Sequence, residues 1–263
     1  MTRTQILAAG ALFACALAPA IAAETPAAMP VGQIIDRNIA ARGGLAAWKA
    51  VQTLTLAGMI DAGGKENHQL PFVNRMKRPH KSRLEITFKD QTSIQVFDGT
   101  HGWKVRPFLN RYEVEDFTAA ELKSASAAEE LDGPLVDYAA KGTKVALIGN
   151  DVVEKHPAYK LKLTTRSGQD LNLWIDAKTF LELKIDGEPR RVDGRMHNVH
   201  VFYRDFKTEH GLTTPRVLET EVDGIKGTHK MDISRVAVNE PMDDSLFQKP
   251  QLNATPAPAA KKP

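Results

Sequence analysis

The stretch YKLKLTTRSGQDLNLWIDAKTFLELKID, residues 159–186, contains three successive segments in which apolar and polar residues alternate. The segments are 159–164, 170–176 and 181–186. Such alternation predicts strands with one buried face and one wet face, because successive side chains of a strand point to opposite sides. The short connection at residues 166–168 predicts that the first two strands are antiparallel neighbours joined as a hairpin.

The same period of two recurs on both sides of this stretch. Further strands are predicted around residues 52–58, 83–88, 93–96, 103–105, 199–206, 217–222 and 230–238. A sheet of about ten or eleven strands tends to curl, and its apolar face needs a cover. The pattern therefore favours a mainly β protein built as a partly closed antiparallel barrel, with helices inside it or across its mouth.

Two helical regions are available as that cover. Apolar residues recur near the helical period over residues 32–51, and the pair Gly43-Gly44 should divide this stretch into two short helices. Thr118 and Glu121 have the spacing of a capping box that opens a helix reaching Leu131, and a second short helix is expected to follow through Ala140. The first of these is rich in Ala and Ser, which fits a movable lid and a poorly packed surface helix equally well.

The two ends of the chain have compositions of their own. Residues 1–23 have the basic, apolar and small-residue order of a cleaved secretory signal, so we expect an exported, periplasmic protein without a transmembrane span. The alternative is that Cys15, in a loose lipobox, is lipidated as a membrane anchor. Residues 24–250 are expected to form one domain, and residues 251–263 a disordered tail rich in Ala, Pro and Lys.

Composition and motifs exclude several classes of function. The net charge of +3 gives no electrostatic case for binding nucleic acid, and Cys15 is the only cysteine, so no disulfide is expected. The sequence lacks a G-x-S-x-G elbow, a P-loop and an H-E-x-x-H motif. His197 and His200 form an H-x-x-H, but on a strand this spacing places them on opposite faces, which disfavours a metal site. We therefore predict that the protein is not an enzyme and that it has no catalytic residue, metal or cofactor.

A basic run occupies residues 75–81, RMKRPHK. It has the composition of a segment that meets anionic lipid headgroups or an acidic partner. The plainer interpretation is a solvated strand edge that Lys and Pro protect from pairing with other chains. The sequence favours the second interpretation.

The order of these parts resembles that of periplasmic LolA-like proteins, the outer membrane lipoprotein-sorting family. The resemblance rests on ARGGLAAW (residues 41–48), FDGTHGW (97–103), the helical insertion between two blocks of strands, and a late hairpin at residues 205–215. It covers residues 31–249 and implies an open antiparallel half-barrel whose concave apolar face is covered by helices. It also implies the binding of lipid or lipoprotein acyl chains, together with envelope proteins as donor or acceptor. No position here matches the arginine that gates the lid of the carriers.

The apolar residues of the alternating strands are the candidate lipid-binding residues, and the cover would add three more. Twelve are expected on the strands: Leu54, Leu56, Leu84, Ile86, Ile94, Val96, Leu161, Leu163, Leu171, Leu173, Leu183 and Ile185. Leu131, Leu135 and Tyr138 are expected on the cover. The alternative hypothesis is an envelope protein-interaction or sensory module on the same scaffold with a filled interior.

Overall fold

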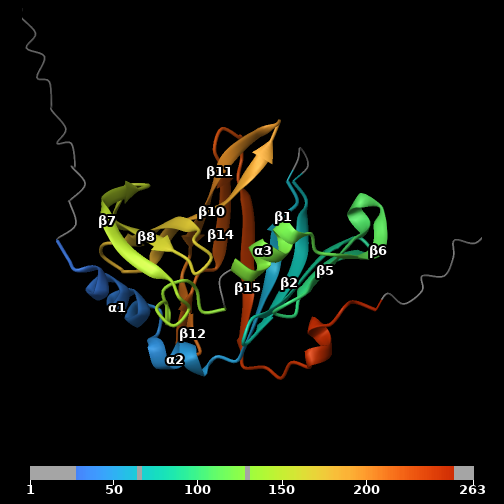
Figure 1. The fold of residues 1–263 in the computed structure, drawn as a ribbon, viewed down its shortest axis with the longest axis horizontal. Helices are drawn as coiled ribbons and strands as arrows, with labels where there is room; N and C mark the ends of the chain where they lie inside the picture. The colour runs from blue at the N-terminus through green and yellow to red at the C-terminus, as the bar shows by residue number, and fades with distance from the viewer. Residues whose placement is uncertain (1–27, 64–66, 128–130, 252–263) are drawn as a thin grey trace, which may run out of the picture.

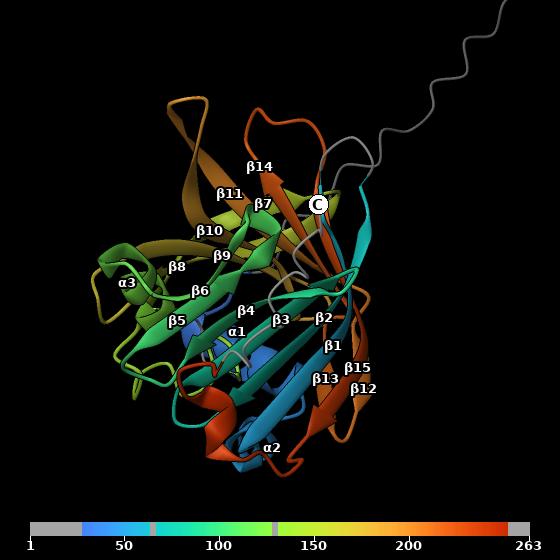
Figure 2. The ribbon, with the colours of Figure 1, turned by 90° about the vertical axis from the view of Figure 1, so that its right-hand side faces the viewer.

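The centre of the protein is a single antiparallel sheet of thirteen strands that curves without closing (Figures 1 and 2). The structure is a computed structural model that describes residues 28–63, 67–127 and 131–251. The predicted signal peptide and residues 252–263 of the predicted tail lie outside this part of the chain. Strands β6 and β7 form the two free edges, and Figure 1 shows them on either side of helix α3. The predicted open half-barrel is therefore confirmed.

Neighbouring strands in the sheet follow the order β6-β5-β4-β3-β2-β1-β15-β14-β11-β10-β9-β8-β7. The first half of the chain supplies β1 (Thr53–Asp61), β2 (Gln69–Lys77), β3 (Lys81–Phe88), β4 (Gln91–Phe97), β5 (Gly102–Arg106) and β6 (Arg111–Asp116). The second half supplies β7 (Lys144–Val153), β8 (His156–Thr164), β9 (Asp170–Asp176), β10 (Glu182–Val192), β11 (Arg195–Arg204), β14 (Val217–Val222) and β15 (His229–Val238). A separate hairpin joins β12 (Lys207–Glu209) to β13 (Leu212–Thr214).

All ten predicted strands are present, and the sheet is larger than predicted because it also contains β2, β6 and β7. The sequence of β2 hides its strand character, since Pro71 interrupts it and its second half is basic. The prediction that residues 75–81 lie at a solvated sheet edge is wrong. Strand β2 pairs with β1 on one side and β3 on the other, and Arg75 forms an ion pair with Glu85 (2.6 Å).

In the described residues, three α-helices and two 3₁₀ turns accompany the sheet: α1 (Val31–Ala41), α2 (Leu45–Ala50), α3 (Ala119–Ala127), η1 (Pro107–Leu109) and η2 (Asp244–Phe247). The predicted break at Gly43-Gly44 is confirmed, with φ values of 112° and 94°. A Cβ on Gly43 would lie 2.2 Å from the carbonyl oxygen of Gly211, and Thr213 N donates to the Arg42 carbonyl (3.0 Å). The break thus seats the helices against the β12–β13 hairpin, which joins two of the segments on which the family resemblance rests.

The second helix expected within residues 132–140 is absent, because these residues form a series of turns. Gly133 and Asp137 have φ values of 80° and 54°, in the left-handed region that a right-handed helix cannot contain. Helix α3 is described over Ala119–Ala127, and the predicted helix end at Leu131 lies in a turn, whereas residues 128–130 lie outside the described residues. The cover is therefore one short helix followed by a compact loop, residues 131–143.

The apolar core lies on the face of the sheet that carries the helices, in two separate clusters. The first packs Ile34 and Ile35 of α1 against β8, β9 and β10. The second packs Trp48 of α2 against β1, β2 and β15. A smaller third cluster, which includes Trp174 and Phe202, lies on the opposite face of the sheet. The helices α1 and α2 thus fill much of the concavity, and the part beneath α3 is left.

Candidate functional site

A hollow of about 610 Å³ lies between α3 and the inner face of strands β2, β3 and β4, and we call it the α3 hollow. Ala120, Glu121, Ser124 and Ala125 line it from one side of α3, as the helical period dictates. Its apolar wall includes Met76, Leu84, Phe97, Phe117 and Leu131, and its polar wall includes Asn74, Ser82, Gln95 and Glu188. The hollow is therefore amphipathic, and its lining is less apolar than the alternation of the strands suggests.

Polar contacts hold α3 over the sheet. Lys104, a buried residue of β5, donates to Glu121 (2.5 Å), and the Ser124 hydroxyl donates to Glu188 of β10 (2.8 Å). The predicted capping box is confirmed, because Thr118 N donates to the Glu121 carboxylate (2.8 Å) and Glu121 N donates to the Thr118 hydroxyl (3.2 Å). None of the described side chains of α3 is buried in the apolar core. Such an element opens at a low free-energy cost.

Glu121 makes the attachment of α3 dependent on pH. Burial raises the pKa of Glu121, but the hydrogen bonds from Lys104 and Thr118 together lower it by more than burial raises it. The pKa of Glu121 therefore lies below its ordinary value of 4.5. The ionised Glu121 carboxylate stabilises the attachment of α3 to the sheet, and this stabilisation is fully present above pH 4.5. It is lost as the pH falls through the lowered pKa. We expect the amide resonances of α3 to be constant above about pH 5 and to shift or broaden in more acidic solution.

The variant Glu121→Gln tests this pH dependence, because glutamine retains the capping-box acceptor but not the charge. In this variant, we expect α3 amides to exchange with deuterium about tenfold faster at neutral pH, the effect of losing about 1.4 kcal/mol. The acid-dependent shift of the α3 resonances should disappear as well. An unchanged titration in the variant would assign it to another carboxylate.

The strand that leads into α3 is anchored at the FDGTHGW motif. The Asp98 carboxylate accepts from Thr100 N and His101 N (2.7 and 2.6 Å), which forms the turn. Position 102 requires a glycine, because the ring of Phe117 occupies the space that a side chain would need. A Cβ added at Gly102 would lie 2.0 Å from that ring. The motif therefore positions Phe117, which lies between β6 and α3 and lines the α3 hollow.

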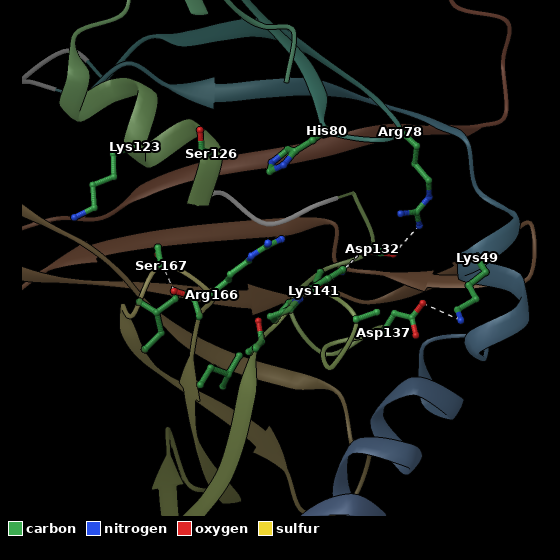
Figure 3. A pocket seen from close by; sticks show the side chains of 17 residues that line it. Lys49, Arg78, His80, Lys123, Ser126, Asp132, Asp137, Lys141, Arg166 and Ser167 are labelled. Carbon is green, nitrogen blue, oxygen red and sulfur yellow. Dashed lines mark hydrogen bonds and ion pairs between the residues drawn. The ribbon is translucent and has the colours of Figure 1, made fainter. Parts of the chain in front are cut away.

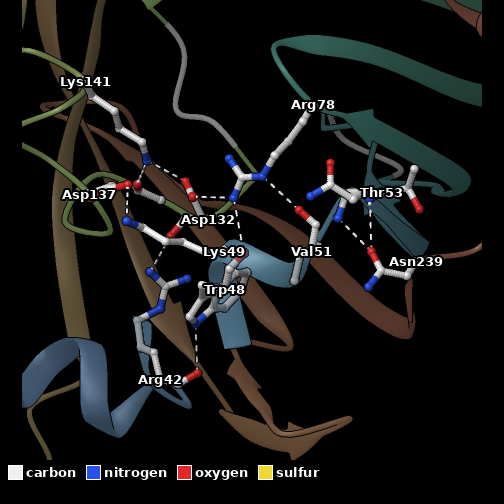
Figure 4. A network of polar contacts seen from close by, with 12 residues as sticks. Arg42, Trp48, Lys49, Val51, Thr53, Arg78, Asp132, Asp137, Lys141 and Asn239 are labelled. Atoms are coloured by element: carbon white, nitrogen blue, oxygen red, sulfur yellow. Dashed lines mark hydrogen bonds and ion pairs between the residues drawn. The ribbon is translucent and has the colours of Figure 1, made fainter. Parts of the chain in front are cut away.

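A network of ion pairs fixes the loop 131–143 (Figure 4). Asp132 is buried, and its carboxylate accepts from Arg78 Nη2 (2.6 Å) and from Lys141 Nζ (2.5 Å). Its backbone carbonyl accepts from Arg42 Nη1 (2.7 Å), and Arg42 Nε lies 3.4 Å from Glu182. Asp132 thereby joins the α1–α2 connection, the end of β2 and the loop.

A second pocket, of about 870 Å³, lies beside this network, and we call it the basic pocket (Figure 3). Lys49, Arg78, His80, Lys123, Lys141 and Arg166 line it, with Asp132 and Asp137 as its carboxylates. Leu163, Leu171 and Pro134 supply apolar surface. His80 also lines the α3 hollow, so the two spaces adjoin.

The predicted lipid-binding residues are distributed over several surfaces. Most of those on β8 to β10 and on the cover lie in or against the cluster beneath α1, namely Leu161, Leu163, Leu173, Ile185, Leu135 and Tyr138. Those in or against the cluster beneath α2 are Leu54, Leu56, Leu84, Ile86 and Leu131. Leu84, Val96 and Leu131 line the α3 hollow, whereas Leu163 and Leu171 line the basic pocket.

Three of these residues have side chains on the opposite face of the sheet. Cross-strand partners share a face, and the register pairs Ile94 with Glu85 and Val96 with Arg83. Arg83 donates to the Leu246 carbonyl of η2 (3.1 Å), so this face is the one against which η2 lies. The prediction that Ile94 and Val96 face the helices is therefore wrong, although Val96 contributes to the wall of the hollow.

Leu183 is the third such residue. The pairing of β10 with β9 shifts by one residue between Glu182 and Lys184, which breaks the period of two. Leu183 consequently packs against the outer cluster of Trp174 and Phe202. The prediction that it shares a face with Ile185 is wrong.

Sequence reasoning did not identify several of the polar residues that define the site. Lys104, Asp132 and Arg166 are single charged residues without a diagnostic spacing. Glu121 carried a signal through the capping box, and Arg78 and His80 lie in the basic run at residues 75–81, which the sequence pattern assigns to a strand edge. Of the described residues, no group of three or more His, Cys, Asp or Glu could hold a metal ion. His200 lies 3.1 Å from Asp186, and His197 contacts the backbone carbonyl of Asp223.

The fold is LolA-like. A LolA superfamily protein from Nitrosomonas europaea has a TM-score of 0.56 at 17% identity, with 84% of this chain and 99% of that chain covered. A candidate outer membrane lipoprotein-sorting protein domain from Vibrio parahaemolyticus has a TM-score of 0.55 at 8% identity, with 82% and 95% covered. A DUF1329 family protein from Desulfovibrio piger has a TM-score of 0.54 at 16% identity, with 83% and 97% covered.

At the level of sequence, no family model matches this chain, and no curated protein matches it. The structural likenesses, at these identities, establish the fold alone. In the part of the chain that the structure describes, no helix has the length and apolar character needed to span a membrane.

Proposed function

We propose that this protein is a periplasmic carrier or binder of lipid or lipoprotein acyl chains, with the α3 hollow as the binding site. The observation that supports this proposal most directly is a space of about 610 Å³ between a curved sheet and a helix held mainly by polar contacts. Its volume lies within the range of about 300–1,000 Å³ that is usual for ligand sites. A role in lipoprotein sorting or related lipid transport fits the LolA-like fold.

The physics of such a site requires no catalytic group. Each buried methylene contributes about 0.8 kcal/mol, so the apolar wall of Leu84, Phe97 and Leu131 would supply most of the affinity. The polar wall and the ordering of the chain reduce that gain. Displacement of α3 would admit the ligand, since α3 contributes no described side chain to the apolar core.

The alternative is an envelope protein-interaction or sensory module. One observation favours it: the concave face beneath α1 and α2 is already packed, with Leu161 and Leu173 fully buried. The space for a hydrocarbon chain is therefore confined to the region beneath α3, which is smaller than an unfilled half-barrel would offer.

Lipid extraction and uptake distinguish the two functions. We expect protein purified from its native periplasm to release a lipid that mass spectrometry identifies, and the delipidated protein to take up a fluorescent fatty acid. A stoichiometric protein partner in pull-downs from envelope extracts, without lipid in either assay, would instead establish the interaction module.

A further inference from the structure

The basic pocket has an excess of positive charge that its own carboxylates do not neutralise. Five Lys and Arg side chains line it, against the two carboxylates of Asp132 and Asp137, which leaves three positive charges in excess. Asp132 is shared by Arg78 and Lys141, and Asp137 pairs with Lys49 (2.8 Å). The pocket therefore favours an anionic occupant.

Arg166 is the cation best placed to meet such an occupant. It lies in the β8–β9 turn and forms no ion pair or hydrogen bond with any residue the structure describes. Its stem lies against Gly142, where an added Cβ would be 3.2–3.4 Å from Arg166 Cβ, Cγ and Cδ. Figure 3 shows its guanidinium directed into the pocket toward His80, whereas Lys123 points away at the rim.

The position of the pocket relative to the α3 hollow suggests what carries the anion. Helix α3 presents Ala120, Glu121, Ser124 and Ala125 to the hollow, and Lys123 and Ser126 to the pocket. With His80 in both walls, an amphiphile could place its hydrocarbon part in one space and its charged group in the other. The hydroxyls of Thr143 and Ser167 add donors to the pocket.

We propose that the basic pocket binds the anionic group of an amphiphile, a phosphate or a carboxylate, with Arg166 as its principal ligand. This inference rests on the proposed function for the hydrocarbon part of the ligand. A guanidinium suits these groups because its N–H donors match the spacing of two oxygens. The pocket would then select acyl ligands by headgroup charge, a property that the hollow alone does not provide.

The test compares two lipids that have the same acyl chains and differ in headgroup. Native mass spectrometry measures the binding of phosphatidylglycerol and of diacylglycerol to the wild type, to Arg166→Gln and to a matched control, Arg195→Gln. Arg195 is exposed in the β10–β11 hairpin and lines neither space. We expect the wild type and the control to prefer phosphatidylglycerol by about tenfold, the effect of one charge-assisted hydrogen bond. Arg166→Gln should reduce the preference to about twofold or less.

The outcomes separate this inference from the proposed function. Equal binding of both lipids by the wild type overturns the anion pocket and leaves the carrier function standing. A preference that Arg166→Gln does not reduce overturns the assignment to Arg166. If neither lipid binds but inorganic phosphate binds in an Arg166-dependent manner, the carrier function fails and the pocket is a site for free phosphate.

When both lipids bind, competition with inorganic phosphate tests whether the lipid headgroup occupies the basic pocket. For a headgroup site, millimolar phosphate should reduce the preference for phosphatidylglycerol to about twofold or less and leave the binding of diacylglycerol unchanged. This result supports the pocket directly, because only the ligand with a phosphate occupies it. Displacement of both lipids to the same extent would contradict a separate headgroup site.

Discussion

Replacing Asp132 with alanine is expected to lower the free energy of unfolding by about 3 kcal/mol, which is the lower end of the cost of breaking a buried ion pair. The Asp132 side chain is 3% exposed, whereas those of its partners Arg78 and Lys141 are 22% and 17% exposed. The substitution leaves both cations without this carboxylate. Water reaches each of them in part, which keeps the cost near the lower limit. Urea denaturation followed by circular dichroism measures the change.

The matched control is Asp137→Asn in the same loop, because asparagine removes the charge and tolerates the left-handed backbone conformation of this residue. Asp137 pairs with Lys49, but both side chains are well exposed, at 41% and 51%. An exposed pair contributes at most about 1 kcal/mol, so this variant should unfold close to the wild type. Equal stability of the two variants would show that the buried network does not hold the loop 131–143.

Ten of the thirteen strands described in the sheet could be predicted from the sequence, because the period of two is local. The Gly43-Gly44 break and the capping box of Thr118 and Glu121 could be predicted for the same reason, since each is set by a few neighbouring residues. The loop after α3 misled the prediction. Its apolar residues fit a helical period, but Gly133 and Asp137 adopt left-handed backbone conformations.

The face of each strand could not be predicted, because it depends on register. The β3–β4 turn is two residues long and pairs Leu84 with Gln95, so the apolar sets of these two strands point to opposite sides. One extra residue in β10 likewise turns Leu183 outward. Both effects are decided by pairing between strands, and alternation within one strand carries no information about them.

The polar part of the site was hidden for a different reason. Lys104, Asp132 and Arg166 have the same appearance in the sequence as the surface charges around them. What distinguishes them is burial for the first two and, for Arg166, direction into a pocket lined by other cations. Such properties arise from contacts between residues distant in the sequence, for example the 54 residues that separate Arg78 from Asp132.

Replacing Ala125 with tryptophan is expected to reduce the affinity for a fluorescent fatty acid by at least about 100-fold. Ala125 lines the α3 hollow, so the indole ring would occupy part of its 610 Å³. Displacing four methylenes of a bound chain forfeits about 3 kcal/mol, which corresponds to a factor above 100. Stability should change little, because the ring enters a space that is open in the free protein and not a packed core.

Ala119→Trp, on the same helix, provides the control for this substitution. Ala119 is exposed and lines neither the hollow nor the basic pocket, so the added ring should leave fatty-acid binding unchanged. Thermal unfolding of both variants verifies that each is folded when binding is measured. If Ala125→Trp is folded and binds the fatty acid as tightly as the wild type, the hydrocarbon chain does not enter the α3 hollow. Because α1 and α2 already pack much of the concave face, that result would favour the interaction module.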